Sequence, residues 1–186
     1  MPFNLPIFLT WLRVATIPLV VGIFYLPESW LDIDEKNLWA TIFFVGAAIT
    51  DWLDGYLARK MQLMTPFGAF LDPVADKLMV AAALVLIAVD MQTLWVTIPA
   101  FIMISREILI SALREWMAGV GQRAQVAVSE VGKYKTAAQM LALIGLIWQP
   151  VGWLTDLSMA LLYIATLLTV WSMLVYLKAS WPALSK

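Results

Sequence analysis

The residues with the clearest capacity for chemistry are four aspartates in or beside long apolar stretches: Asp51, Asp54, Asp72 and Asp76. One aspartate at the centre of a membrane-spanning helix costs about 2.5–3.5 kcal/mol, so four such residues indicate a function even near the helix ends. Residues three or four apart share one face of a helix, so Asp51 and Asp54 form one stripe. Asp72 and Asp76 form another if their helix begins before Pro73.

A short loop joins the two helices, so the facing stripes would bring four carboxylates together. Like charges this close either share protons or hold cations. The chain has no His and no Cys, which excludes a Ser-His-Asp triad, a thiolate nucleophile and any His- or Cys-ligated metal. Oxygen ligands alone favour Mg²⁺, Mn²⁺ or Ca²⁺ over zinc.

A simpler interpretation is that Asp51 and Asp54 only mark the end of one span, while Asp72 caps the next helix with Pro73 in its first turn. This explains Asp72 but not the other pair, because the helix dipole opposes negative charge near a C-terminal end. A positive group must therefore compensate Asp51 and Asp54.

The elements that position these residues follow from composition. Of the 186 residues 62% are hydrophobic and 13% charged, with a mean hydropathy of +0.84, whereas soluble chains carry about 25% charged residues. Six windows approach the roughly 20 apolar residues that a span needs: Ile7–Leu26, Leu38–Leu57, Leu71–Val89, Leu94–Leu113, Tyr134–Val151 and Leu154–Leu177. We expect an all-α integral membrane protein, a single domain over residues 1–186 with six transmembrane helices. Met1–Pro6 would form a short N-terminal interfacial segment, without the features of a cleaved signal peptide.

Charge distribution predicts the orientation. Of the 12 Lys and Arg residues, all but Lys36 fall at the termini or in and beside the even-numbered connections. The positive-inside rule makes that side cytoplasmic, with both termini and the aspartates there. An even number of spans is required, and four would leave long apolar runs unused. The net charge of −1 gives no reason to expect nucleic acid.

The aspartates belong to a longer pattern, D-x2-D-G-x2-A-R-x8-G-x3-D-x3-D, whose eight fixed positions are Asp51, Asp54, Gly55, Ala58, Arg59, Gly68, Asp72 and Asp76. This pattern is similar to the signature of the CDP-alcohol phosphatidyltransferase family, and residues 104–116 and 131–136 extend the resemblance. The resemblance implies transfer of a phosphatidyl group from CDP-diacylglycerol to an alcohol, with release of CMP. It also implies a bacterial inner membrane, a six-span fold and a homodimer.

By the same resemblance, the four aspartates hold two Mg²⁺ or Mn²⁺ ions, bridged by Asp51 and Asp72, and Asp76 is also the general base. The resemblance further assigns binding of CDP-diacylglycerol to Gly55, Ala58, Arg59, Thr65 and Gly68, and to Asn4, Thr10 and Arg13 of the N-terminal segment. The small residues also have an ordinary interpretation, the close packing of helices.

The acceptor is indicated by cations. Arg106 and Arg114 are eight apart and so share a helical face, while Lys133 and Lys135 begin the fifth span. Four cations beside the carboxylates would suit an acceptor phosphate. They could equally contact lipid headgroups or pair with Glu107 and Glu115.

A phosphate pocket favours glycerol 3-phosphate over serine and leaves inositol phosphate open. From a different class, a cation or proton transporter would also carry carboxylates in the membrane. A transporter, however, would not need the Asp-Gly…Ala-Arg spacing.

Overall fold

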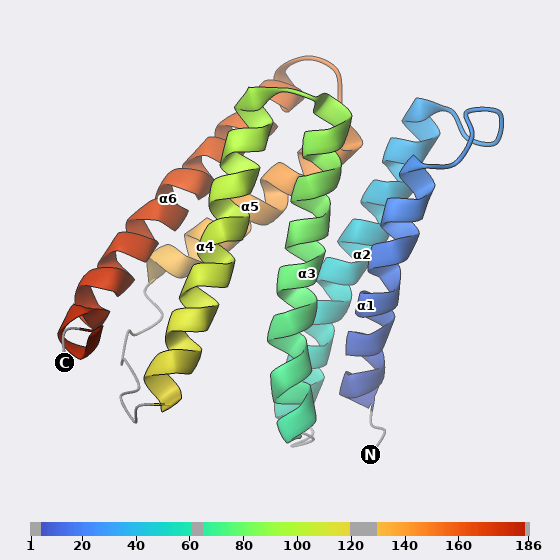
Figure 1. Ribbon diagram of the computed structural model, residues 1–186. Coiled ribbons are helices and arrows are strands. Elements are labelled where there is room, and N and C mark those ends of the chain that lie inside the picture. The colour runs from blue at the N-terminus through green and yellow to red at the C-terminus, as the bar shows by residue number, and fades with distance from the viewer. Residues whose placement is uncertain (1–4, 61–64, 120–129, 185–186) are drawn as a thin grey trace. The chain divides into compact units, whose positions relative to one another are not determined.

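A computed structural model describes residues 5–60, 65–119 and 130–184, and these form six α-helices (Figure 1). Their bounds are α1 Leu5–Phe24, α2 Ile33–Lys60, α3 Pro66–Met91, α4 Leu94–Gly119, α5 Glu130–Trp148 and α6 Trp153–Leu184. Each helix contains most of one predicted apolar window, which confirms the all-α prediction. Backbone amides among apolar neighbours must be satisfied within their own segment, and a helix does this.

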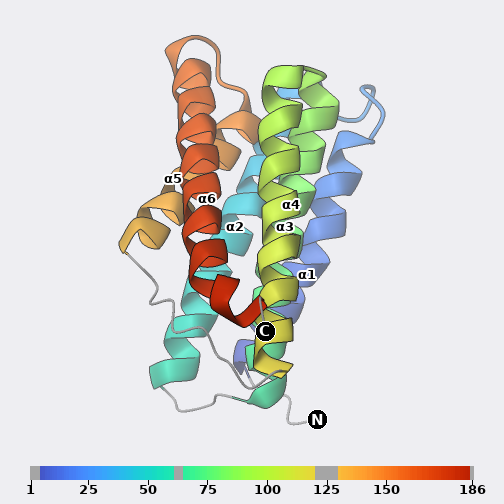
Figure 2. The same ribbon diagram turned by 60° about the vertical axis from the view of Figure 1, so that its left-hand side comes forward.

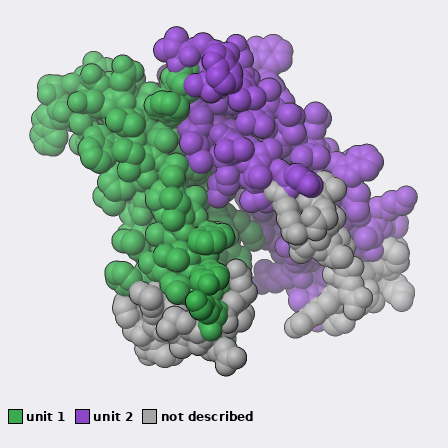
Figure 3. All heavy atoms as spheres, turned by 180° about the vertical axis from the view of Figure 1, so that it is seen from behind, with its two compact units in different colours: residues 1–87, 147–150 green, residues 88–146, 151–186 purple. Residues whose placement is uncertain are grey.

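The chain divides into two compact units (Figure 3). Unit 1 comprises Met1–Ile87 and Ile147–Pro150, and therefore holds α1, α2 and most of α3. Unit 2 comprises Ala88–Leu146 and Val151–Lys186, with α4, α6 and nearly all of α5. The aspartates lie in unit 1, and the predicted acceptor cations lie in unit 2.

Side chains and turns define the helix ends. Asp32 accepts a hydrogen bond from the Glu35 amide at 2.8 Å, and the Glu35 carboxylate accepts one from the Asp32 amide at 3.2 Å. This is a capping box at the start of α2. Gln92 and Gln149, which follow α3 and α5, have positive φ angles of 45° and 50°, a conformation common just after a helix.

The start of α3 corrects one sequence interpretation. Thr65 caps the helix: its hydroxyl accepts a hydrogen bond from the Gly68 amide at 3.0 Å, and Pro66 takes the first helical position. Asp72 therefore lies inside α3, and the interpretation of Asp72 as a cap is wrong. Pro73 lies within the helix although it cannot donate to the ladder, and Gly68, Asp72 and Asp76 share one stripe as expected.

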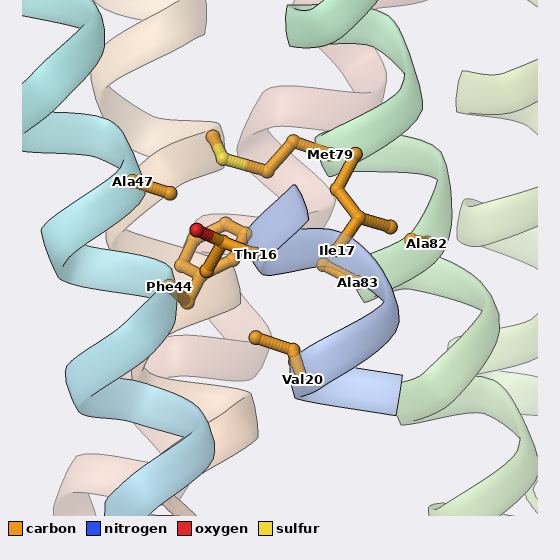
Figure 4. A pocket seen from close by; sticks show the side chains of 8 residues that line it. All are labelled: Thr16, Ile17, Val20, Phe44, Ala47, Met79, Ala82 and Ala83. Atoms are coloured by element: carbon orange, nitrogen blue, oxygen red, sulfur yellow. The ribbon is translucent and has the colours of Figure 1, made fainter. Parts of the chain in front are cut away.

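In unit 1, α1 and α2 form an antiparallel pair joined by residues 25–32 and run side by side (Figure 1). An apolar cleft is lined by side chains of all three helices of the unit (Figure 4): Thr16, Ile17, Val20, Phe44, Ala47, Met79, Ala82 and Ala83. These residues pack the interior of the unit one to two turns from the aspartates.

In unit 2, α4 and α6 run parallel and side by side (Figure 1, Figure 2). The Tyr163 hydroxyl of α6 donates a hydrogen bond to the Trp95 carbonyl of α4 at 2.9 Å. Helices α5 and α6 approach very closely at Gly145, where an added Cβ would lie 1.9 Å from the Ser158 hydroxyl oxygen. Gly145 is thus a packing residue, because any side chain there would collide with α6.

Three helices among the described residues are long and apolar enough to span a membrane, over Ile7–Phe24, Leu94–Gly119 and Trp153–Trp181. Only 22–28% of each of these windows is buried, so most of their apolar side chains face outward. This indicates an integral membrane protein. Helices α2, α3 and α5 carry more charge and do not meet the same criterion, so the six-span count stays a prediction. The predicted interfacial segment falls partly outside the described residues, and Leu5 and Pro6 belong to α1.

Candidate active site

Three of the four aspartates pair with one arginine from α1. The Arg13 side chain has no exposed surface, and its Nη1 lies 2.5 Å from Asp51 Oδ1 and 2.6 Å from Asp76 Oδ1. Its Nη2 pairs with Asp54 Oδ2. The sequence required a positive group near Asp51 and Asp54, and among the described residues the structure supplies it as Arg13.

Thr10 completes the link between the helices. It lies one turn before Arg13, and its hydroxyl donates to Asp72 Oδ1 at 2.7 Å, with Asp54 Oδ2 at 3.4 Å. One face of α1 thus supplies two polar side chains to carboxylates on α2 and α3. The predicted convergence of the two aspartate stripes is confirmed, since Arg13 contacts both.

Burial differs strongly across this carboxylate cluster, which comprises Asp51, Asp54, Asp72 and Asp76. The Asp54 side chain is 3% exposed, whereas those of Asp51 and Asp76 are 36% and 48% exposed. Asp51 and Asp76 are therefore accessible at the surface, while Asp54 lies in the interior of unit 1.

The carboxylate cluster has the donor chemistry that a divalent ion needs. Its donors are carboxylate and hydroxyl oxygens, which suit Mg²⁺ or Mn²⁺. As they stand, no three Asp or Glu residues in the described part of the chain are arranged to hold one ion. The Arg13 guanidinium lies among the carboxylates, so the donor chemistry fits a metal whereas the present arrangement fits an arginine.

The other residues predicted to bind CDP-diacylglycerol are only partly described by the structure. An added Cβ at Gly68 would lie 3.2 Å from the Thr65 hydroxyl and 3.8 Å from Ile7 of α1, so small size here also serves packing. Gly55 follows Asp54 on α2. Asn4 and the side chains of Ala58 and Arg59 lie outside what the structure describes.

In unit 2, Glu107 joins two of the predicted acceptor cations. Its Oε1 lies 2.7 Å from Arg106 Nη1 and 3.1 Å from Lys135 Nζ, so α4 and α5 meet through one carboxylate. The Arg106 and Lys135 side chains are only 13% and 10% exposed. Pairing with Glu107 was the simpler sequence alternative for these cations, and it occurs here.

Helix α6 holds the two arginines of α4. Arg106 Nη2 donates to the Ser172 hydroxyl at 3.0 Å, and the Arg114 guanidinium lies 5.5 Å from the centre of the Tyr176 ring. Arg106 Nε is buried without a hydrogen-bond partner. The Lys133 side chain lies outside the described residues.

A model of the CDP-alcohol phosphatidyltransferase family matches residues 3–171. The chain belongs to this family. CDP-alcohol phosphatidyltransferases are transferases, and membership therefore makes the chain an enzyme, which decides against a transporter.

Close relatives carry a more specific name. The chain is 58% identical to the CDP-diacylglycerol–glycerol-3-phosphate 3-phosphatidyltransferase of Haemophilus influenzae, over 97% of this chain and 95% of that protein. It is 55% and 53% identical to the proteins of the same name from Pectobacterium atrosepticum and Escherichia coli, over 97% of this chain and 96% of each relative.

Sequence reasoning about this phosphatidyltransferase missed Ser172 and Tyr176. They lie four apart on one face of α6 and contact arginines eight apart on α4. A serine in an apolar span is too common to be a signal by itself, and only the packing of α6 on α4 identifies it.

Proposed function

We propose that this protein transfers the phosphatidyl group of CDP-diacylglycerol to glycerol 3-phosphate, giving phosphatidylglycerophosphate and CMP. The observation that carries the proposal is identity of 53–58%, over nearly the whole chain, to enzymes named for that reaction. The complete aspartate motif, of which Asp51, Asp54 and Asp76 pair with Arg13 in unit 1, supports it.

In the reaction, a hydroxyl oxygen of glycerol 3-phosphate forms a bond to the phosphorus that carries the diacylglycerol. The bond from that phosphorus to the bridging oxygen of the diphosphate breaks, and CMP leaves with this oxygen. Asp76 would accept the proton of the attacking hydroxyl. Its 48% exposure supports this role, because a general base must lie within hydrogen-bond reach of the proton that it removes.

Asp51, Asp54, Asp72 and Asp76 would hold Mg²⁺ or Mn²⁺, two ions in all. Bound divalent ions would neutralise charge on the diphosphate and on the leaving CMP. The chain's own part is to present the carboxylates from two helices, with Thr10 orienting Asp72 and Asp54.

The nucleotide and diphosphate of CDP-diacylglycerol would bind at residues of the motif and of the N-terminal segment: Gly55, Ala58, Arg59, Thr65, Gly68, Asn4, Thr10 and Arg13. Supporting this, Thr10 and Arg13 contact the motif aspartates directly.

Arg106 and Lys135 would bind the phosphate of glycerol 3-phosphate, assisted by Arg114 and Lys133. Their support is a net positive cluster: two poorly exposed cations share the single carboxylate of Glu107. The unpartnered Nε of Arg106 keeps a donor available for a phosphate oxygen.

We further propose six spans in a bacterial inner membrane, a homodimer, and a cytoplasmic location for both termini and for the active site. The asymmetry of Lys and Arg supports the orientation. The CDP-diacylglycerol substrate would then reach the enzyme from within the bilayer.

The decisive experiment measures CMP release by the purified full-length protein from CDP-diacylglycerol, with glycerol 3-phosphate, inositol phosphate or serine as acceptor. We expect release with glycerol 3-phosphate, its loss after EDTA treatment and its recovery with Mg²⁺ or Mn²⁺. Release only with another acceptor would overturn the substrate assignment, and no release with any acceptor would overturn the activity. Activity that persists in EDTA would overturn the proposed dependence on a divalent metal ion.

A further inference from the structure

Arg13 is more deeply buried than the aspartates of the carboxylate cluster, and it belongs to a helix outside the aspartate motif. We propose that Arg13 is a resident counter-ion of the cluster, which divalent ions must displace, so that Arg13 sets the affinity of the site for metal. This rests on the proposed function only in taking the four aspartates as the metal ligands.

The four carboxylates of the cluster need a positive counter-charge. Four carboxylates on neighbouring helices repel one another, and a buried charge is tolerated only when it is paired. Arg13 pairs with three of them, while Thr10 donates to Asp72. Without metal, Arg13 therefore permits α2 and α3 to pack with their acidic faces together.

Arg13 and a divalent ion would compete for the same oxygens. The oxygens that pair with Arg13 are Asp51 Oδ1, Asp54 Oδ2 and Asp76 Oδ1, three of the oxygens that an ion in the cluster would need. Mg²⁺ requires ligand oxygens at about 2.0–2.1 Å in near-octahedral order. Oxygens spread around a planar guanidinium do not meet that requirement, so the guanidinium has to withdraw before an ion binds.

Divalent ions can also supply the positive charge that Arg13 provides. The Arg13 guanidinium is held through Nη1 and Nη2, whereas its Nε is buried without a partner. Two divalent ions would supply more positive charge than the single guanidinium that they replace. Metal and Arg13 are thus alternative counter-ions for the same carboxylates, and binding of one opposes the other.

The test measures Mn²⁺ binding alone, by electron paramagnetic resonance of free Mn²⁺, on purified full-length protein in detergent. Arg13→Gln removes the cation that competes with Mn²⁺ for the carboxylates. Coupled binding events typically change affinity by about tenfold, so this variant should bind Mn²⁺ about tenfold more tightly than the wild type. Arg13→Lys, which keeps a charge but has one nitrogen, should show a smaller gain. Lys178→Gln removes an exposed cation on α6 and should leave Mn²⁺ affinity unchanged.

Thermal unfolding gives a second readout. The metal-free Arg13→Gln protein should melt at a lower temperature than the wild type. Saturating Mn²⁺ should raise the melting temperature of this variant by more than it raises that of the wild type, because tighter binding stabilises the folded state more. If Arg13→Gln does not fold, Arg13→Lys decides the question.

Mn²⁺ affinity that is unchanged or weaker in these variants would overturn the inference while the proposed function stands. If the wild type binds no Mn²⁺, the proposed metal site and the inference fail together.

Discussion

Replacing Asp76 by Asn tests the proposed general base with the least change of shape. Asp76 shares Arg13 Nη1 with Asp51, so Arg13 keeps Asp51 and Asp54 as partners after the substitution. The fold and CDP-diacylglycerol binding should therefore survive. A positioned base contributes about 10²–10⁴-fold to rate, and we expect Asp76→Asn to lower kcat for CMP release by that factor.

The assay must separate loss of the base from loss of a metal ligand. Activity is measured at a saturating concentration of glycerol 3-phosphate while Mg²⁺ is raised well above the wild-type requirement, and CDP-diacylglycerol binding is measured at equilibrium. Since an amide oxygen still ligates metal but accepts no proton at neutral pH, excess Mg²⁺ should not restore turnover. Asp156→Asn, an exposed acid in the first turn of α6, is the matched control and should retain activity.

Three results would refute this reasoning. Wild-type kcat in Asp76→Asn would show that Asp76 is not the base. Recovery of turnover by excess Mg²⁺ would show that its role is to hold metal. A parallel loss of CDP-diacylglycerol binding would show instead that the carboxylate organises the whole site.

Three further predictions address the acceptor site and the helix cap. Arg106→Ala removes a charge-assisted hydrogen bond to the acceptor phosphate, so it should raise the KM for glycerol 3-phosphate by about 10–100-fold and the KM for CDP-diacylglycerol far less. Equal changes in the two KM values would indicate a general structural role. Tyr176→Leu removes a cation–π contact with Arg114 worth about 0.5–2 kcal/mol and should raise the KM for glycerol 3-phosphate about 2–30-fold. Tyr176→Phe keeps the aromatic ring, so its KM should stay near that of the wild type. The same KM in both variants would count against a role for this contact. Thr65→Ala removes the cap of α3, worth about 1 kcal/mol, and should lower the melting temperature by about 2–4 °C, with Thr65→Ser restoring it; a serine variant no more stable than the alanine one would argue against capping.

Local pattern was sufficient for the helices and for the acidic stripes. Apolar runs of span length predict α-helix wherever they occur, because the backbone must satisfy its own hydrogen bonds. The three- and four-residue spacings placed Asp51 with Asp54 and Asp72 with Asp76, as α2 and α3 confirm. The cap of α3 was missed because Asp72-Pro73 and Thr65-Pro66 carry equally good N-terminal signals, and local sequence does not decide between them.

The sequence predicted less well which groups the charged side chains pair with. Arg13 stands 38 residues before Asp51, and its spacing from the motif carries no periodic signal. The resemblance placed Arg13 at the nucleotide, whereas the structure pairs it with three aspartates. Similarly, the sequence suggested that Glu107 pairs with its neighbour Arg106. The contacts of Lys135 with Glu107 and of Ser172 with Arg106 depend on how α5 and α6 pack, which the sequence does not predict.

The sequence by itself therefore determined the helical class, the acidic motif and, through the absence of His and Cys, the restriction to oxygen ligands and cations. These follow from residue type and spacing, which fix the face of a helix on which each side chain lies. The tertiary structure alone decided that Arg13 and Thr10 of α1 meet the carboxylates, and that Ser172 and Tyr176 of α6 hold the arginines of α4. Such contacts join helices far apart in the chain, so they depend on how whole helices pack against one another.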